Sequence, residues 1–142
     1  MRTVLFVCIH NAGRSQMAEA IFNHIAQEQG LTMRAISAGT EVGDAVNPVA
    51  IQAMVEMGVS LNNHKPKMLT DEMVEAADRI VTMGCGIEAS ACPGRVFASE
   101  DWGLDDPKGK ELDEVRAIRD RILERVKVLI ATMDGMPATA DV

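Results

Sequence analysis

The stretch Thr3–Ala20, TVLFVCIHNAGRSQMAEA, contains a short apolar run, a polar loop and the beginning of an amphipathic segment. The run Val4–Val7 is typical of a parallel strand that is covered on both faces. Cys8 ends this run. Beyond the loop, apolar residues recur at three- and four-residue spacing, with Ser15 as the expected N-cap of a helix. These residues predict a strand, a tight loop and a helix.

Cys8 and Arg14 bracket the loop with the spacing C-x5-R. Backbone N–H groups of such a loop and of the following helical turn converge without partners, which makes a cradle for an anion. The guanidinium of Arg14 can hold two oxygens of a tetrahedral oxyanion, and it favours the thiolate form of Cys8. The spacing alone is a weak signal, and a structural cysteine beside a surface arginine is the alternative. Its place at a strand end favours a nucleophile beneath a phosphate-like anion.

The composition limits the class of protein. The chain has 142 residues, 47% of them hydrophobic and 25% charged, as expected for one globular domain. No apolar run has transmembrane length and no signal-peptide pattern is present, so we expect a cytoplasmic monomer, without membrane contact, whose three cysteines are reduced. The net charge of −7 argues against a nucleic-acid partner.

Strand and helix signals alternate along the rest of the chain. Three further stretches are predicted strands, the last of them weaker: Met33–Ser37, Arg79–Met83 and Arg95–Ala98. This alternation predicts an α/β fold, a single-domain three-layer α/β/α arrangement with a four-stranded parallel sheet. Ligands of such sheets bind at the carboxyl ends of the strands, where Cys8 and Cys85 both fall.

Three more helices are predicted after the first. One is capped by Asn47, with Pro48 at its first position, and another opens after Thr70. The last and clearest repeats apolar residues from Leu112 to Met133. The domain is therefore expected to span residues 1–134, and residues 135–142 are expected to form a disordered tail.

Cys85 and Cys92 lie together in the sequence GCGIEASACPG. Their C-x6-C spacing differs from that of paired zinc ligands, and His24 and His64 have no ligand-like partners, so no metal site is expected. The small residues around them would let two sulfurs approach to disulfide distance. One interpretation is a redox relay in which Cys85 reaches Cys8 and then Cys92. The other is two incidental cysteines in a loop.

An acidic loop, DWGLDDP, covers residues 101–107. Pro107 restricts the backbone of Asp106 to an extended conformation. A carboxylic acid above an anion cradle could protonate a departing oxygen, because nearby negative charge keeps the acid protonated. An acidic surface loop without a chemical role is an equal alternative. Trp102 is expected in the core rather than as a lid contact.

Together these motifs resemble one family. VCIHNAGRSQMAEA, SAGT at Ser37–Thr40 and DDP at Asp105–Pro107 resemble the low-molecular-weight protein tyrosine phosphatase fold. HNAGRSQMAEA combined with Cys85 and Cys92 resembles, more closely, the thioredoxin-coupled arsenate reductases built on that fold. The resemblance extends to about Met133.

The resemblance implies reduction of arsenate to arsenite without a bound cofactor. Cys8 would attack arsenate, and Asp106 would assist the loss of an oxygen. Cys85 would then attack the Cys8 sulfur and release arsenite, and Cys92 would form the Cys85–Cys92 disulfide that thioredoxin reduces. Phosphate and sulfate would compete with arsenate. Asn11 and Ser15 would hold the loop and stabilise the Cys8 thiolate. The loop residues that would bind the oxyanion are Ile9, His10, Asn11, Ala12, Gly13, Arg14 and Ser15.

The sequence departs from this pattern beneath the loop. Some relatives bind a potassium ion there, using positions like Asn11 and Glu19 with a threonine and an aspartate from another loop. That other loop is HKPK here, at residues 64–67. We therefore expect the ammonium group of Lys65 or Lys67 to replace the ion beside Glu19, so that activity does not respond to potassium.

Other functions remain open at this stage. MGC, ACP and WGLDDPKGK also resemble relatives that use a low-molecular-weight thiol and a glutaredoxin-like partner. The main rival is a tyrosine phosphatase, in which Cys85 and Cys92 would be idle. An aromatic content of 3%, without tyrosine, favours a small inorganic oxyanion over an aryl phosphate. A cradle that senses an anion without turnover is a third possibility.

Overall fold

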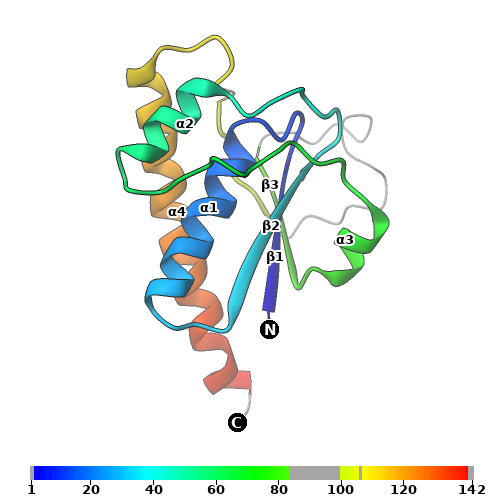
Figure 1. Ribbon diagram of the computed structural model, residues 1–142. Helices are drawn as coiled ribbons and strands as arrows, with labels where there is room; N and C mark the ends of the chain where they lie inside the picture. Colours follow the sequence, from blue (N-terminus) through cyan, green and yellow to red (C-terminus); the bar gives the residue numbers. More distant parts are fainter. Residues whose placement is uncertain (1, 84–99, 106, 141–142) are drawn as a thin grey trace.

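The computed structural model describes residues 2–83, 100–105 and 107–140, with side chains to residue 134 (Figure 1). The elements follow the order β1 (Arg2–Cys8), α1 (Arg14–Glu28), β2 (Met33–Gly39), α2 (Pro48–Val55), α3 (Asp71–Ala76), β3 (Arg79–Thr82), β4 (Glu100–Asp101) and α4 (Leu112–Ala140). Three predicted site residues lie outside the described residues: Cys85, Cys92 and Asp106.

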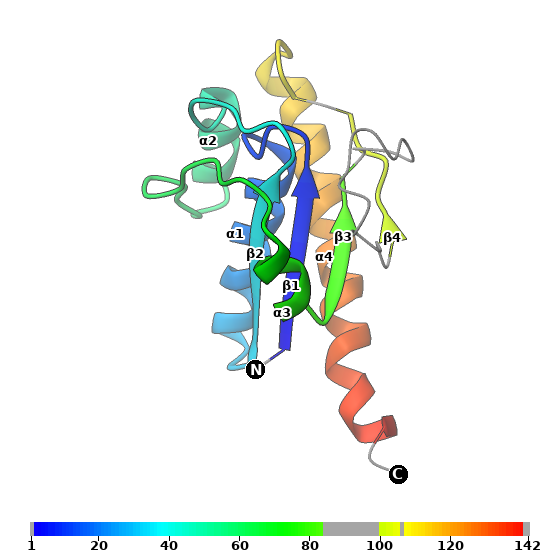
Figure 2. The same cartoon turned by 90° about the vertical axis from the view of Figure 1, so that its right-hand side faces the viewer.

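The four strands form one parallel sheet, as predicted, and the structure gives their order as β2-β1-β3-β4. Figure 2 shows their carboxyl ends together at the upper edge. The predicted strand Arg95–Ala98 lies outside the described residues, and the fourth described strand is Glu100–Asp101. Cys8 pairs with Gly39 at the end of β1, so the cradle begins where β1 and its neighbour β2 end.

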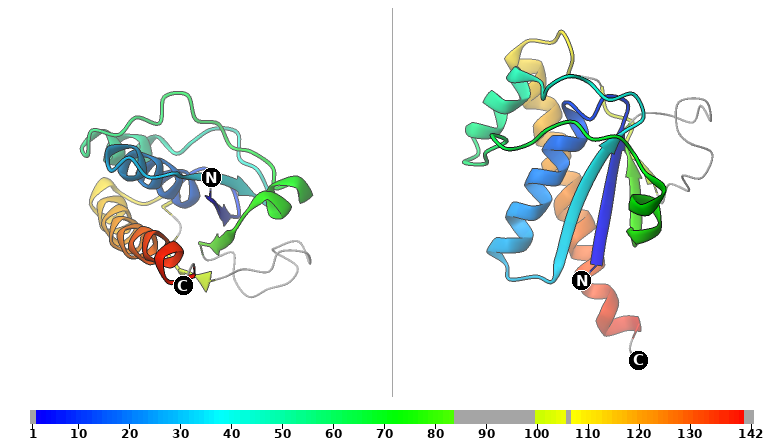
Figure 3. Two further views of the ribbon diagram at one scale, coloured as in Figure 1. Left: turned by 90° about the horizontal axis from the view of Figure 1, so that it is seen from below. Right: turned by 45° about the vertical axis from the view of Figure 1, so that its right-hand side comes forward.

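Helices cover both faces of the sheet, which confirms the three-layer prediction. Helices α1, α2 and α4 lie on one side and α3 on the other (Figures 1 and 3). Alternation along β1 sends Phe6 into the larger core with α1 and α4, and sends Leu5 and Val7 into the smaller core under α3. Because both faces are covered, Val4–Val7 is buried throughout, as the continuous apolar run predicted.

Two of the predicted helix starts are confirmed. The side chain of Asn47 accepts hydrogen bonds from the backbone nitrogens of Val49, at 2.8 Å, and Ala50, at 3.3 Å, at the start of α2. The hydroxyl of Thr70 accepts one from Met73, at 3.2 Å, at the start of α3. Local side-chain capping therefore sets both starts.

The predicted N-cap of α1 is wrong. The helix begins at Arg14, and the cap position is Gly13, which makes no side-chain cap hydrogen bond. Ser15 lies inside the first turn, where its hydroxyl faces the sulfur of Cys8 at 2.8 Å. A serine hydroxyl that is held by side chains from the loop is not available to cap a helix.

Helix α4 is longer than predicted. It continues to Ala140, so the expected domain boundary between residues 134 and 135 falls inside the helix. A glycine such as Gly135 lowers helix stability by about 1 kcal/mol relative to alanine but does not by itself end a helix. A disordered tail stays a prediction only for residues 141–142, which lie outside the described residues. No helix within the described ranges is long and apolar enough to cross a membrane.

An ion-pair group holds α2 against α4. The carboxylate of Glu56 accepts from Arg116 at 2.6 Å and from Arg119 at 2.8 Å, and Arg119 also donates to the carbonyl of Ala53 at 2.8 Å. The hydrogen bonds from Arg116 and Arg119 lower the pKa of Glu56 to about 2. Glu56 therefore stays charged at acidic pH as well as at neutral pH, and its ion pairs with α4 persist there.

Candidate active site

The loop between β1 and α1 has its amide groups turned inward. Three of its carbonyls accept hydrogen bonds from the segment that follows β2: Ile9 from Glu41 at 2.7 Å, His10 from Gly43 at 3.0 Å, and Ala12 from Asn47 at 2.7 Å. In a trans peptide unit the N–H points opposite to the carbonyl. The N–H groups that follow these three carbonyls therefore face away from residues 41–47, as an anion cradle requires.

Cys8 lies beneath this loop with two groups directed at its sulfur. The side chain is buried, and its Sγ lies 3.2 Å from the backbone nitrogen of Asn11 and 2.8 Å from the hydroxyl of Ser15. Hydrogen bonds donated to a sulfur stabilise its negatively charged form. The arrangement suits a nucleophilic thiolate.

The guanidinium of Arg14 is held by the chain at the carboxyl ends of two other strands. Its Nη1 donates to the carbonyls of Met83, at 2.6 Å, and Leu104, at 3.0 Å. Met83 follows β3, and Leu104 lies in the loop after β4. Arg14 is buried, so these two bonds set the plane of the guanidinium beside the cradle.

The cradle opens into a cleft of about 680 Å³. One wall is the loop that carries the predicted acid. A Cβ added to Gly13 would lie 2.5 Å from Cγ of Pro107, so this loop packs directly against the cradle. Asp106 precedes Pro107 but lies outside the described residues, and its role as an acid stays a prediction. Cleft residues from the three bordering segments include Cys8, His10, Arg14, Glu41, Asp44, Pro107 and Lys108.

A polar cluster lies beneath the loop around Glu19. Its carboxylate accepts a hydrogen bond from Ser37 at 2.8 Å, and it faces the ammonium of Lys67 at 3.6 Å and Nδ1 of His64 at 3.4 Å. Among the described residues, Lys65 joins this cluster only through its backbone carbonyl, which accepts a hydrogen bond from a glutamine of α1. Of the two lysines proposed from sequence, Lys67 is therefore the one that lies beside Glu19.

Sequence reasoning missed two members of this cluster. His64 was expected to have no ligand-like partner, yet its Nδ1 contacts Gln16 at 2.8 Å as well as Glu19. Gln16 is fully buried among polar groups. In the sequence, the signal for it is a polar residue directly before the apolar Met17 and Ala18 in the first turn of α1. Among the described residues, no three histidine, cysteine or acidic side chains are grouped as a metal site would require.

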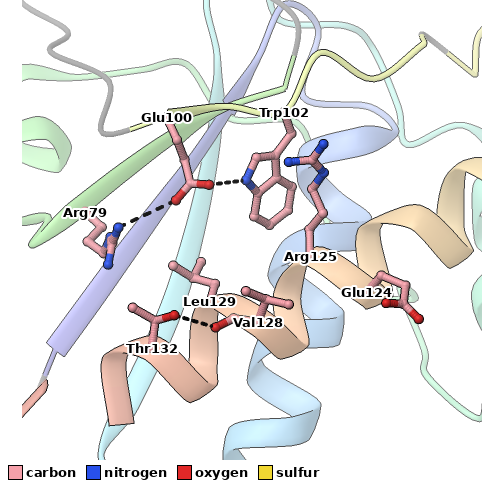
Figure 4. Close-up of a pocket in the computed structure, with 8 residues that line it drawn as sticks. All are labelled: Arg79, Glu100, Trp102, Glu124, Arg125, Val128, Leu129 and Thr132. Atoms are coloured by element: carbon pink, nitrogen blue, oxygen red, sulfur yellow. Dashed lines mark hydrogen bonds and ion pairs between the residues drawn. The ribbon is translucent and has the colours of Figure 1, made fainter. Parts of the chain in front are cut away.

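A second pocket lies at the β4 edge of the sheet, against α4, and has a volume of about 420 Å³ (Figure 4). Trp102 forms one wall and donates from its indole nitrogen to Glu100 at 2.7 Å, while Arg79 holds the same carboxylate at 3.6 Å. The indole is buried and lies 5.4 Å from the ring of Phe6, which confirms Trp102 as a core residue. None of the cradle residues lines this pocket.

Comparison with known protein families matches residues 3–136 to the low molecular weight phosphotyrosine protein phosphatases. The chain belongs to this family. The match covers nearly the whole chain and includes the cradle, the cleft and the polar cluster. The family predicted from the motifs is therefore confirmed.

Relatives of the chain within the family carry the name arsenate reductase. Arsenate reductase 1 of Staphylococcus haemolyticus is 36% identical, over 93% of this chain and 97% of its own. An arsenate reductase of Bacillus cereus is 39% identical, over 89% of this chain and 92% of its own. The resemblance to arsenate reductases is thus confirmed over most of the length of both proteins.

Solved structures of the family include both reductases and phosphatases. An arsenate reductase in its phosphate-binding state superposes with a TM-score of 0.80 at 32% identity, covering 93% of this chain and 98% of the other. A thioredoxin-dependent arsenate reductase from Corynebacterium glutamicum gives 0.74 at 34% identity, with 94% and 62% covered. The arginine phosphatase YwlE gives 0.81 at 30% identity, with 93% and 95% covered. The fold is therefore common to two chemistries.

Proposed function

We propose that the protein reduces arsenate to arsenite, with Cys8 as the nucleophile, Cys85 and Cys92 as a disulfide relay, and thioredoxin as the external reductant. The observation that carries this proposal is a buried sulfur that faces two hydrogen-bonding groups, inside an amide cradle beside the anchored Arg14. The names of the relatives, together with the three cysteines of the chain, favour reduction over hydrolysis.

In the first step the Cys8 thiolate attacks arsenic, and one oxygen leaves as water after protonation, with Asp106 as the proton donor. Cys85 then attacks the sulfur of Cys8. The sulfur–arsenic bond breaks, and its electron pair stays on arsenic, which leaves as arsenite. The two electrons come from the two thiols, which become a Cys8–Cys85 disulfide. Cys92 attacks Cys85, frees the Cys8 thiolate, and leaves a Cys85–Cys92 disulfide for thioredoxin.

The cradle and Arg14 would act on the oxyanion. Inward amides and a guanidinium neutralise its charge, so that a negatively charged sulfur can approach. Phosphate has the same shape and charge as arsenate and is expected to compete for the site. Selectivity for reduction would then come from the relay rather than from anion binding.

A thioredoxin-coupled assay that follows NADPH oxidation tests the proposal. With wild type, oxidation should require arsenate and continue over many turnovers. In Cys85→Ser arsenite release should stop, because no thiol attacks the Cys8 adduct. In Cys92→Ser each enzyme molecule should release one arsenite and then stop at the Cys8–Cys85 disulfide. Hydrolysis of aryl phosphates without arsenate reduction would contradict the proposal. Turnover that is insensitive to Cys92 and requires a small thiol would contradict the relay.

We further propose that the ammonium of Lys67 takes the place of a potassium ion beside Glu19, at 3.6 Å. Reductase activity should therefore be the same in potassium and in sodium chloride of equal ionic strength. Lys67→Met should leave the Glu19 carboxylate without its cation and make activity rise with potassium. Lys65→Met is the matched control and should create no such response, because only the carbonyl of Lys65 is used. A potassium-dependent rise in the wild-type protein would refute this substitution.

A further inference from the structure

Gln16 is a fully buried polar side chain that the proposed reaction does not use. Its Nε2 donates to the side-chain oxygen of Asn11 at 2.9 Å, to the backbone oxygen of Asn11 at 3.2 Å, and to the backbone oxygen of Lys65 at 3.0 Å. Its Oε1 lies 2.8 Å from Nδ1 of His64. Because Nε2 faces only acceptors, Oε1 is the acceptor of the pair, and Nδ1 of His64 carries the hydrogen. Gln16 is thereby held in one orientation.

Beyond Gln16, a series of hydrogen bonds leads through Asn11 and Ser15 to the sulfur of Cys8, and each member donates to the next. The side-chain oxygen of Asn11 also accepts from the backbone nitrogen of Lys67 at 2.8 Å. Two donors, Gln16 and Lys67, therefore fix which end of the Asn11 side-chain amide is the oxygen. Its Nδ2 consequently donates to the hydroxyl oxygen of Ser15 at 2.7 Å. A Cys8 thiolate has no hydrogen to donate, so the Ser15 hydroxyl, which accepts from Asn11, donates its own hydrogen to that sulfur, 2.8 Å away.

The backbone of Asn11 has an unfavourable conformation that surrounding contacts must hold in place. Its φ of 52° lies in the left-handed region, and it is the one non-glycine residue with positive φ among those the structure describes. Such a conformation persists only where surrounding contacts hold it. Gln16 supplies two of these contacts, one to the side chain of Asn11 and one to its backbone carbonyl.

We propose that Gln16 is a positioning residue for the nucleophile. It holds Asn11 in the orientation that makes the Ser15 hydroxyl a donor to Cys8, and His64 completes the series as the donor to Gln16. This inference rests on the proposed role of Cys8 as the nucleophile. It assigns a function to Gln16 and His64 that acts through Ser15 and requires no contact with the oxyanion.

The test measures the rate at which iodoacetamide alkylates Cys8 in a Cys85→Ser/Cys92→Ser background, where Cys8 is the only thiol. Gln16→Met keeps the length of the side chain and removes its hydrogen bonds. We expect alkylation at pH 7 to slow about tenfold, the value of one hydrogen bond to a charged group. At alkaline pH, where the thiol ionises without help, the rate should stay within about twofold of the parent protein. A damaged fold would change both rates.

A double-mutant cycle tests whether Gln16 acts through Ser15. Ser15→Ala should slow alkylation of Cys8 at pH 7, and adding Gln16→Met should slow it by no more than about twofold further. Asn23→Leu is the matched control. That amide of α1 is tied to Ala35 by bonds of 3.0 and 2.8 Å, away from the cradle, and its loss should leave Cys8 reactivity unchanged.

A second pair of variants decides the matter if Gln16→Met does not fold. His64→Leu removes the donor to Gln16 and should slow alkylation of Cys8, whereas His64→Asn keeps an N–H near the position of Nδ1 and should restore it. Three results would overturn the inference: an unchanged rate in Gln16→Met, full additivity with Ser15→Ala, or equal rates in the two His64 variants. Alkylation needs neither arsenate nor thioredoxin, so this test is independent of the test of the reductase proposal.

Discussion

Replacing Cys8 with serine is expected to abolish arsenate reduction, by at least about 10⁴-fold, because a serine hydroxyl is a weak nucleophile and cannot form the disulfide that supplies electrons. Oxyanion binding should survive. The cradle amides and the Arg14 guanidinium are held by contacts to other parts of the chain, at Met83, Leu104 and residues 41–47, and those contacts do not involve the sulfur. The protein should therefore bind phosphate and not turn over arsenate.

Quenched single-turnover measurement of arsenite, together with calorimetric titration of phosphate, checks this prediction. Cys92→Ser is the matched control, since it retains Cys8 and Cys85 and should still release one arsenite per molecule. Cys8→Ser should release none. Arsenite release by Cys8→Ser would exclude Cys8 as the nucleophile. A loss of phosphate binding in Cys8→Ser would show that the sulfur also supports the cradle.

Gly39→Ala is the second change with a large expected effect. An added Cβ would lie 2.7 Å from the carbonyl oxygen of Ile9 and 2.9 Å from the backbone nitrogen of Asn11. Gly39 cannot move back, because its own N–H and carbonyl are bonded on the other side to Lys67 at 2.8 Å and Leu69 at 2.9 Å. The cradle would have to shift. We expect a loss of about 1–3 kcal/mol in the free energy of unfolding, as for other overpacked sites.

The displaced amides should also weaken phosphate binding by about tenfold or more, since one hydrogen bond to a charged group contributes about 1.5–3 kcal/mol. Urea unfolding and calorimetric titration measure the two effects. Gly43→Ala is the matched control for stability, because its added Cβ would meet its nearest atoms at 3.7 Å, an ordinary contact. The prediction is contradicted if Gly39→Ala unfolds at the same urea concentration as Gly43→Ala and binds phosphate normally. In that case the added Cβ fits beside Ile9 and Asn11 without displacing them.

Both variants, Cys8→Ser and Gly39→Ala, change the place where β1 and β2 end and the cradle loop begins. The sequence predicted the strand and the loop at this place. The apolar run Val4–Val7, the C-x5-R spacing and the cap at Asn47 are local patterns, and each is realised where it was predicted. Strand burial and helix capping depend on residues within a few positions of one another, so single segments contain the information. The parallel sheet followed from the alternation of these segments, whereas the order of its strands came from the structure.

Other features depended on contacts between distant segments. Ser15 seemed free to cap α1 because its competitors, Cys8 and the Asn11 side chain, meet it only once the loop is folded. The end of α4 was also misplaced, because glycine disfavours a helix only weakly. Serine favours N-cap positions and glycine disfavours helices, but both preferences are weak. Tertiary contacts decided the position of Ser15, and the continuing helix decided the end of α4.

By itself, the sequence determined the family, the sheet and the pairing of a cysteine with an arginine around an anion cradle. Only the tertiary structure decided that Lys67, rather than Lys65, lies beside Glu19, and that His64 and Gln16 join the cluster. His64 is separated from Gln16 by 48 positions in the chain. No local pattern encodes such a contact, because the direction of each hydrogen bond depends on the partner that the folded chain brings to it.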